Sequence, residues 1–219
     1  MSWQRSMSWQ RGIYAITDSS LLPDDERLIA ACEAALQGGL ALLQYRDKST
    51  DDARRWRQSQ ALAALCRRFD VPLIINDDLA LTRRLRVAGF DGVGLHLGEQ
   101  DTSLDEARRL LGSEPIIGAS CYASLAIAER AAAAGASYLA FGRFFASQTK
   151  PEASPAPLEL LAEAARFGLP RVAIGGLDVD NVARVRHAGG DLLATVYAVF
   201  GGDDPTGRVA GLRQHAGYA

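Results

Sequence analysis

Cysteine and long apolar runs are scarce in this sequence of 219 residues. Its three cysteines, Cys32, Cys66 and Cys121, form no CxxC pair and have no nearby histidine, which argues against a disulfide framework or a zinc site. Reduced thiols are usual in the cytoplasm, so we expect a cytoplasmic protein. No apolar run reaches the roughly 20 residues of a transmembrane helix, and the N-terminus has no apolar signal-peptide core, so we expect no membrane association.

An excess of positive charge is also missing. The formal net charge is −2, whereas nucleic-acid-binding domains are usually basic, so we expect no nucleic-acid partner. Apolar residues make up 48% of the sequence and charged residues 23%, as in ordinary soluble globular proteins. One domain of this length buries roughly 70% of the surface that its unfolded chain exposes, so it can build a core without disulfides or a structural metal.

The first residues repeat themselves, because MSWQR occupies residues 1–5 and again residues 7–11. We interpret residues 1–11 as a duplicated start or an added tail that is poorly ordered. Residues 12–219 show no linker or shift in composition, so we expect them to form one domain.

From residue 12 onward, short apolar runs alternate with longer segments of helical pattern. The eight strand-like runs are Ile13–Thr17, Ala41–Tyr45, Pro72–Ile75, Gly92–Leu97, Pro115–Ala119, Tyr138–Phe141, Arg171–Ile174 and Leu192–Val196. Their nearly continuous apolar character is typical of parallel strands buried on both faces. The eight helical segments are Asp25–Gln37, Thr50–Phe69, Leu79–Ala88, Ser103–Leu111, Ser124–Ala134, Pro157–Phe167, Asp178–Ala188 and Thr206–His215. This order predicts an α/β fold, a single-domain (β/α)8 TIM barrel, with a doubly wound open sheet as the alternative.

Polar residues gather where the predicted strands end, and in a barrel these ends form the rim that carries catalytic groups. Arg46 and Lys48 follow the second strand at a spacing that can turn both side chains to one side, where two cations would suit a diphosphate. The simpler alternative is a solvated ion-pair face with Asp47.

Two carboxylates, Asp77 and Asp101, follow the third and fourth strands. One or two carboxylates, completed by water and substrate phosphates, are the usual protein ligands of Mg²⁺, so this pair predicts a magnesium site. Aspartates that precede helices are more often N-caps, and Asp101 could serve the helix near Ser103 in this way. Asp78 is better placed than Asp77 to cap the following helix, which leaves Asp77 available to a metal.

Two further groups could bind phosphate. Gly175 and Gly176 lie between a strand and a helix, where backbone N–H groups favour an anion, although a glycine pair is otherwise an ordinary turn. Ser147, Thr149 and Lys150 lie on the long connection between residues 146 and 157, which is either a binding loop or a polar loop tip. We expect His96 to be a packed residue at a strand end.

Six segments, taken in order, resemble the motif set of the thiamine phosphate synthase family. They are LLQYRDKS (42–49), LIINDD (73–78), GLHLGEQD (94–101), IIGASC (116–121), FGRFFASQTK (141–150) and AIGG (173–176). The resemblance implies a transferase of thiamine biosynthesis that uses Mg²⁺. It would join 4-amino-2-methyl-5-hydroxymethylpyrimidine diphosphate to hydroxyethylthiazole phosphate and release pyrophosphate. Its partners would be these small molecules, and the sequence leaves the oligomeric state open, a homodimer included.

The resemblance also implies residue roles. The pyrimidine diphosphate would contact Gln44, Arg46, Lys48, Asn76, Ser120 and Lys150, of which Arg46, Lys48, Ser120 and Lys150 would act in catalysis. The thiazole phosphate would contact Ser147, Thr149, Gly176, Val196 and Tyr197, and Mg²⁺ would bind Asp77 and Asp101. Tyr197 stands where the family commonly has serine, which removes a small hydroxyl at the second phosphate.

Two other functions remain open at this stage. The sister group of the family is a thiazole tautomerase, which would need the thiazole phosphate pocket but no diphosphate and metal set. A non-catalytic barrel that binds a phosphate ligand is the second. The joint presence of Arg46, Lys48, Asp77, Asp101 and Lys150 favours the synthase.

Overall fold

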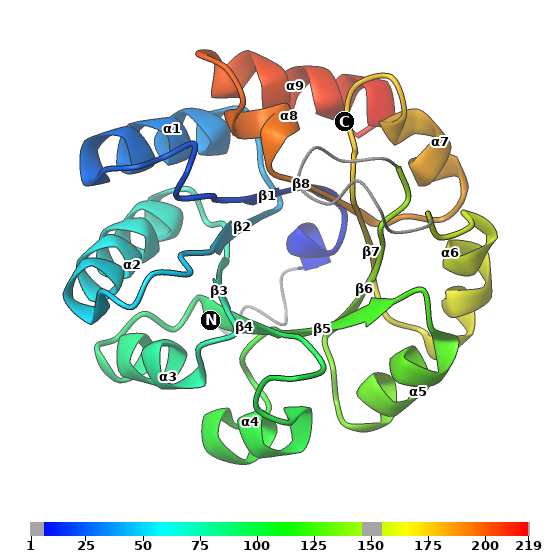
Figure 1. Ribbon diagram of the computed structural model, residues 1–219, viewed down its shortest axis with the longest axis horizontal. Coiled ribbons are helices and arrows are strands. Elements are labelled where there is room, and N and C mark those ends of the chain that lie inside the picture. Colours follow the sequence, from blue (N-terminus) through cyan, green and yellow to red (C-terminus); the bar gives the residue numbers. More distant parts are fainter. Residues whose placement is uncertain (1–6, 146–154, 219) are drawn as a thin grey trace.

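Eight parallel strands close into a barrel, with the helices outside the ring (Figure 1). The computed structural model describes residues 7–145 and 155–218. The strands are β1 (Gly12–Ile16), β2 (Leu42–Tyr45), β3 (Leu73–Asn76), β4 (Val93–Leu97), β5 (Ile117–Tyr122), β6 (Tyr138–Gly142), β7 (Arg171–Ile174) and β8 (Leu192–Thr195). They follow each other around the ring in chain order, and β1 pairs with β8. The predicted (β/α)8 barrel is confirmed, and the open sheet is excluded.

All helices except α8 overlap the predicted segments, and six of them begin at a side-chain cap. The helices are α1 (Asp25–Gln37), α2 (Asp52–Arg68), α3 (Leu79–Val87), α4 (Leu104–Leu111), α5 (Leu125–Ala133), α6 (Glu159–Glu163), α7 (Val182–His187), α8 (Tyr197–Phe200) and α9 (Pro205–Ala216). The caps of α1 to α5 and of α9 are Asp24, Asp51, Asp78, Ser103, Ser124 and Asp204, each accepting from a backbone N–H three residues on. The predicted helix 157–167 divides into α6 and the 3-10 helix η3 (Ala164–Phe167), and the short α8 is not predicted from the sequence.

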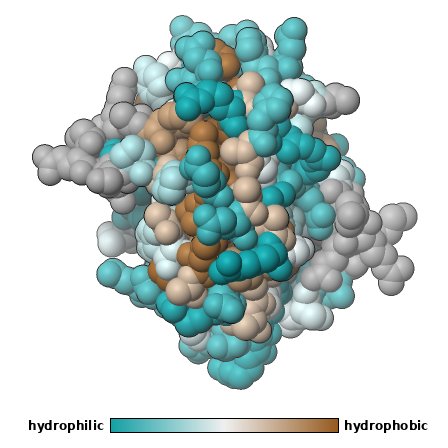
Figure 2. All heavy atoms as spheres, turned by 90° about the vertical axis from the view of Figure 1, so that its right-hand side faces the viewer, coloured by the Kyte–Doolittle hydropathy of each residue, from teal (hydrophilic) through white to brown (hydrophobic). Residues whose placement is uncertain are grey.

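The core has two layers, which explains why the strands are apolar on both faces. One layer lies between the strands and the surrounding helices and includes the free cysteines Cys32, Cys66 and Cys121. The other fills the inside of the barrel, where its largest members are Trp9, Tyr14 and Tyr138. The outer face that carries α5, α6 and α7 is polar over most of its area, around a more hydrophobic central stripe (Figure 2). No helix in the described part of the chain is long and apolar enough to span a membrane.

The second MSWQR copy belongs to the folded barrel. Met7–Gln10 form the 3-10 helix η2, which projects into the centre of the ring of strands in Figure 1. Trp9 is only 4% exposed, and its ring packs edge-on against Tyr138 with centroids 6.4 Å apart. The expectation of a poorly ordered tail is therefore corrected for residues 7–11, because burial of the indole holds them at the N-terminal end of the barrel. Residues 1–6 lie outside the described residues.

Candidate active site

The segment after β2 places two cations at the carboxyl ends of the strands. Arg46 Nη1 lies 3.4 Å from Asp18 Oδ2, which follows β1, and Lys48 Nζ pairs with Asp77 Oδ2, which follows β3. The Arg46 backbone N–H also donates to Thr17 Oγ1 over 2.9 Å, which fixes this segment to the end of β1. Both cations therefore lie at the mouth of the barrel, as predicted.

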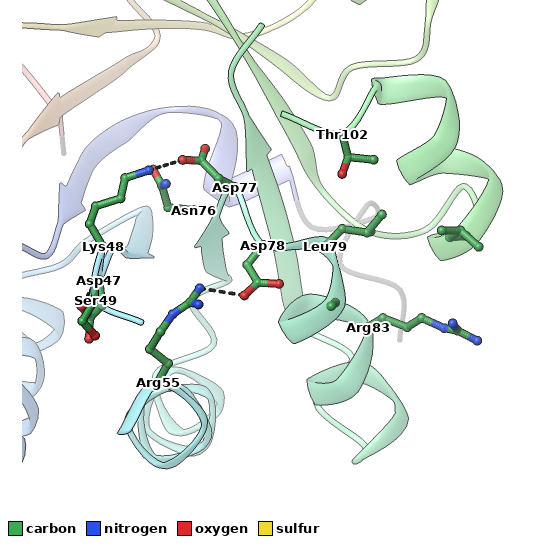
Figure 3. A pocket seen from close by; sticks show the side chains of 12 residues that line it. Asp47, Lys48, Ser49, Arg55, Asn76, Asp77, Asp78, Leu79, Arg83 and Thr102 are labelled. Carbon is green, nitrogen blue, oxygen red and sulfur yellow. Dashed lines mark hydrogen bonds and ion pairs between the residues drawn. The ribbon is translucent and has the colours of Figure 1, made fainter. Parts of the chain in front are cut away.

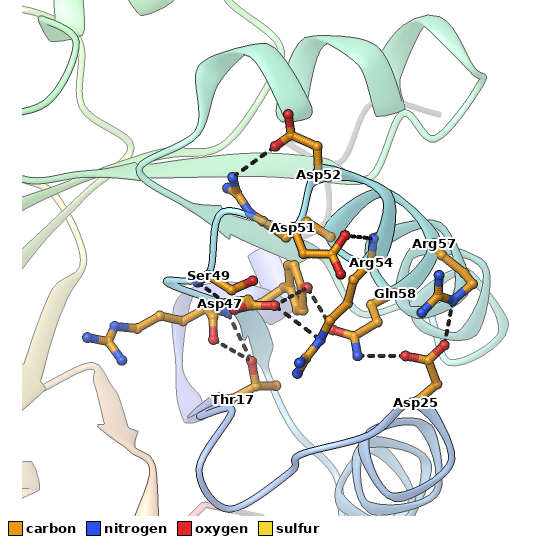
Figure 4. Close-up of polar contacts among 12 residues, drawn as sticks. Thr17, Asp25, Asp47, Ser49, Asp51, Asp52, Arg54, Arg57 and Gln58 are labelled. Carbon is orange, nitrogen blue, oxygen red and sulfur yellow. Dashed lines mark hydrogen bonds and ion pairs between the residues drawn. The ribbon is translucent and has the colours of Figure 1, made fainter.

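Asp47 lies beside Ser49 and Arg54 (Figure 4). Its side chain is buried, accepts from the Ser49 backbone N–H over 2.8 Å and lies 3.5 Å from Arg54 Nε on α2. The Tyr45 hydroxyl, 3.3 Å from Asp47, bonds to Gln58 on the same helix over 2.8 Å. The alternative of a solvated ion pair with Asp47 is therefore wrong, because Asp47 is buried and pairs with Arg54 of α2. Arg46 and Lys48 pair instead with carboxylates at the mouth of the barrel.

Asp77 and Asp101 lie close together at the ends of β3 and β4, near enough for each carboxyl group to shift the pKa of the other. Lys48 donates a hydrogen bond to the Asp77 carboxylate, and its side chain reaches toward Asp77 in Figure 3. The Asp101 carboxylate accepts from the Gly98 backbone N–H over 2.7 Å, and the cap of α4 is Ser103. Asp101 is thus not the helix cap that the sequence allowed as an alternative.

Asp78 is the cap of α3, as predicted. It accepts from the Leu81 backbone N–H over 2.8 Å and from Arg55 Nη2 over 2.7 Å. Asp77 is therefore free of capping, and its backbone has φ of +61°, in the left-handed region that few residues other than glycine adopt. The strain of a non-glycine residue in this region is often found at functional sites.

The two carboxyl groups have opposite pKa shifts. Burial raises the pKa of Asp77, but the bonds from Lys48 and Asp101 outweigh it and hold that pKa below its ordinary value. Burial and the adjacent Asp77 carboxylate raise the pKa of Asp101 above its ordinary value. Two neighbouring carboxylates repel each other when both are ionised, so the pair tends to keep one proton. A divalent cation between them would offset this repulsion, and both groups could then be ionised.

A cavity of about 550 Å³ opens beside this group, on the side of α2 and α3. Lys48, Asn76, Asp77 and Thr102 line it, together with Arg55 and Arg83 from these helices (Figure 3). The cavity is large enough for a small phosphorylated molecule, whose anionic part would meet cationic side chains.

Inside the barrel, a line of hydrogen bonds joins two predicted substrate-binding residues, Gln44 on β2 and Ser120 on β5. Gln44 Nε2 donates to the Tyr14 hydroxyl over 2.6 Å, and the Tyr14 and Tyr138 hydroxyls lie 2.8 Å apart. The Tyr138 hydroxyl lies 2.9 Å from His96 Nδ1, and His96 Nε2 lies 2.9 Å from Ser120 Oγ. Burial lowers the pKa of His96 to about 4, so the ring is neutral near pH 7.

The predicted residues for the second phosphate follow β7 and β8. Gly176 has φ of +67°, a conformation that suits glycine, and its carbonyl accepts from Asn181 Nδ2 over 2.9 Å. Val196 precedes the short helix α8, which begins at Tyr197, and the Tyr197 side chain is 56% exposed. Ser147, Thr149 and Lys150 lie outside the described residues.

Sequence reasoning missed four residues near this mouth or beneath it. Asp18 follows β1 and could have been found by the same strand-end rule that found Asp77. His96 was expected only to be packed, yet both of its ring nitrogens are hydrogen-bonded. Tyr14 and Tyr138 look like core residues in the sequence, and their hydroxyl contacts depend on strands that are far apart in the chain.

A closed barrel with paired cations and carboxylates at the carboxyl ends of its strands has the layout of a (β/α)8-barrel enzyme. The family model described as thiamine monophosphate synthase matches residues 13–199, and the chain belongs to this family of transferases.

One solved structure supports this assignment, and two others share the fold. The chain is similar to the thiamine phosphate pyrophosphorylase from Pyrococcus furiosus, with 29% identity over 97% of this chain and 98% of that chain and a TM-score of 0.83. The thiamine phosphate pyrophosphorylase from Bacteroides thetaiotaomicron is 15% identical over 94% and 98% of the two chains, with a TM-score of 0.60. KGPDC from Streptococcus mutans is 13% identical over 94% and 98%, with a TM-score of 0.68. At these lower identities the last two similarities concern the fold alone.

Proposed function

We propose that this protein is a Mg²⁺-dependent thiamine phosphate synthase. It would join 4-amino-2-methyl-5-hydroxymethylpyrimidine diphosphate to hydroxyethylthiazole phosphate. The observation that carries the proposal is the group of Arg46, Lys48, Asp77 and Asp101 at one mouth of the barrel. The family to which the chain belongs supports the same activity.

The diphosphate would lie against Arg46 and Lys48. Arg46 can offer parallel N–H donors to phosphate oxygens, whereas Lys48 contributes a compact charge. Their present partners, Asp18 and Asp77, are carboxylates at the same mouth, so an arriving diphosphate would compete with them for the cations. Lys150 would add a third cation, as the family resemblance implies.

The residues present fit a magnesium ion. Asp77 and Asp101 would supply two carboxylate ligands that lie close together, and Mg²⁺ commonly takes one or two carboxylates and completes its shell with water and substrate phosphates. The described residues contain no group of three potential metal-binding side chains, so the proposed ion would depend on the diphosphate for further ligands. When bound, the ion would neutralise charge on the departing pyrophosphate.

The thiazole phosphate would lie on the opposite side, at the loops after β7 and β8. Many (β/α)8 barrels bind a phosphate there through backbone N–H groups. Gly176 allows close approach of the backbone, and Val196 and Tyr197 begin a helical turn beside it. Because Tyr197 is largely exposed, we assign this position a backbone contact only.

The reaction forms one bond and breaks one bond. The thiazole nitrogen gives its electron pair to the pyrimidine methylene carbon, and the carbon–oxygen bond to the diphosphate breaks, with that electron pair leaving on pyrophosphate. No side chain has to act as a nucleophile. Arg46 and Lys48 would act by holding the leaving group in fixed positions and stabilising its charge.

A pyrophosphate-release assay with both substrates and Mg²⁺ tests the proposal. We expect Asp77→Asn to reduce turnover by a factor of about 10² or more, as for the loss of a preorganised electrostatic group. Asp52→Asn is the matched control, because the Asp52 side chain is 93% exposed and its ion-pair partner among the described residues is Arg55 on its own helix. Circular dichroism would establish that both variants are folded.

Three outcomes separate the candidate functions. Pyrophosphate release that needs both substrates supports the synthase. Ligand binding without release would indicate a non-catalytic barrel, and isomerisation of a thiazole phosphate alone would indicate the tautomerase. Near-normal turnover of folded Asp77→Asn would contradict the roles given to the carboxylate pair.

A further inference from the structure

The buried polar residues inside the barrel form an uninterrupted series of hydrogen bonds, which we call the polar chain. Its members, in order, are Gln44, Tyr14, Tyr138, His96 and Ser120. Tyr14 and Tyr138 are 1% and 0% exposed, so their hydroxyl groups are shielded from bulk solvent. Each must therefore satisfy its hydrogen-bonding capacity within the polar chain.

Gln44 sets the direction of these bonds. Its Nε2 atom can only donate, so the Tyr14 oxygen accepts from it and the Tyr14 proton is left to go to Tyr138. The reverse arrangement would leave a buried Tyr14 proton without an acceptor, at a cost of about 1–3 kcal/mol. The Tyr138 oxygen thus accepts from Tyr14, and its own proton goes to His96 Nδ1.

The direction continues through the imidazole. A neutral histidine has one donor and one acceptor nitrogen, so an accepting Nδ1 places the ring proton on Nε2. Nε2–H then donates to Ser120 Oγ over 2.9 Å. Because the Ser120 oxygen already accepts a bond, its own proton is available to a further acceptor.

We propose that all hydrogen bonds of the polar chain donate in the same direction, from Gln44 toward Ser120. This arrangement presents the Ser120 hydroxyl as a donor to an anionic group at the mouth. Tyr14, Tyr138 and His96 act in it as positioning residues, through Ser120. A diphosphate has only acceptor oxygens, so it matches a serine whose proton is available for donation. This functional part rests on the proposed function, whereas the direction of the bonds does not.

The packing around Tyr138 supports a specific arrangement. The His96 and Tyr138 rings stack with centroids 5.6 Å apart and an angle of 13°, and Tyr14 meets Tyr138 edge-on at 5.9 Å and 86°. Gly118 on β5 leaves the space that the Tyr138 ring occupies, because an added Cβ would lie 1.9 Å from Tyr138 Cζ. The three rings are thus held by packing as well as by their hydrogen bonds.

The tautomer of His96 tests the direction without any ligand. In protein labelled with ¹⁵N at histidine, long-range ¹H–¹⁵N spectra distinguish a protonated ring nitrogen from an unprotonated one, and loss of signals in His96→Gln assigns them. We expect the proton on Nε2 in the native protein near pH 8. A proton on Nδ1 would overturn the proposal.

Gln44→Glu supplies a sharper test in the same spectra. A carboxylate can only accept, so Tyr14 would donate to it and each later bond would reverse, which moves the His96 proton to Nδ1. The comparison variant is Gln58→Glu, which adds the same charge at another buried glutamine whose side chain bonds to Tyr45 and Asp25 outside the polar chain. A His96 proton that stays on Nε2 in Gln44→Glu would show that Gln44 does not set the direction.

Binding of inorganic pyrophosphate with Mg²⁺, measured by calorimetry, tests the functional part. Tyr138→Phe cuts the polar chain, and we expect the affinity to fall roughly three- to tenfold, the equivalent of one net hydrogen bond. Tyr218→Phe is the control, because it removes a hydroxyl that bonds to the Asp191 carbonyl before β8. Equal affinity in native protein and folded Tyr138→Phe would refute the role of the polar chain in presenting Ser120 as a donor. Absence of pyrophosphate binding to the native protein would count against the proposed function and leave the tautomer result standing.

Discussion

Gly118 and Tyr138 face each other on neighbouring strands inside the barrel, and the tyrosine ring fills the space above the glycine. Any side chain at position 118 would overlap the ring, since an added Cβ would lie within 2.3 Å of three of its atoms, the hydroxyl oxygen included. The hydrogen bonds of Tyr138 to Tyr14 and His96 therefore require glycine on the opposing strand.

Gly118→Ala should lower the free energy of unfolding by about 1–3 kcal/mol, because the overlap can be relieved only by moving a packed ring or the backbone. Urea denaturation followed by circular dichroism would measure the change. Gly211→Ala is the control. Gly211 lies inside α9 with nothing within 4 Å of an added Cβ, so alanine there should raise stability by about 0.5–1 kcal/mol. Equal stability of the two variants would contradict the packing described.

Trp9→Ala should lower the free energy of unfolding by about 3–5 kcal/mol, because removing a buried indole leaves a cavity at the N-terminal end of the barrel. Trp9→Phe should cost less, since an aromatic ring still fills part of the space. Denaturation midpoints of the two variants would give the comparison. A cost below about 0.5 kcal/mol for Trp9→Ala, the range of surface substitutions, would mean that η2 contributes little to stability.

Stability should fall as the pH drops from about 6.5 to about 4, in part because of His96. Its pKa is lowered to about 4 in the folded protein, whereas an unfolded histidine has a pKa of about 6.5. Between these values the unfolded chain binds a proton that the folded chain does not, so each pH unit removes up to about 1.4 kcal/mol. Unfolding at several pH values, compared between native protein and His96→Gln, isolates this effect. The same pH dependence in both would refute it.

Ser103→Ala should cost about 1 kcal/mol of stability and leave turnover unchanged, because Ser103 caps α4 by accepting from the Glu106 backbone N–H over 3.2 Å. Ser103→Gly should cost only a few tenths of a kcal/mol. The Glu106 side chain pairs with Arg109 3.6 Å away, so this cap relies mainly on the serine. Thermal unfolding and the pyrophosphate assay on both variants would measure the two effects, and a loss of turnover would place Ser103 nearer the chemistry than its cap implies.

The sequence predicted the fold well because each strand is apolar on both faces and most helices are followed by a glycine. All eight strands lie where the apolar runs predicted them, and α1 has the predicted bounds. The four-residue helices η2 and α8 are too short to show a helical period. The burial of Trp9 depends on contact with Tyr138, which no local pattern could reveal.

The candidate site was predicted in part, for a related reason. Charged residues such as Lys48 and Asp77 directly follow strands, and closure of the barrel brings them together. The direction in which Asp47 turns could not be predicted, because it depends on Arg54 in the next helix. The polar chain was missed because its members alternate with apolar residues on five different strands and look like ordinary core positions.

Asp77 has a left-handed backbone conformation, so stability and function favour different residues at this position. A β-carbon in that conformation costs roughly 1–2 kcal/mol that glycine would avoid, so Asp77→Gly should be favoured in a laboratory evolution experiment that selects only for heat tolerance. The same change would remove the carboxylate that Lys48 and Asp101 contact. A library screened for yield or melting temperature alone would therefore enrich variants that are more stable but inactive. Position 77 should be held constant in such work.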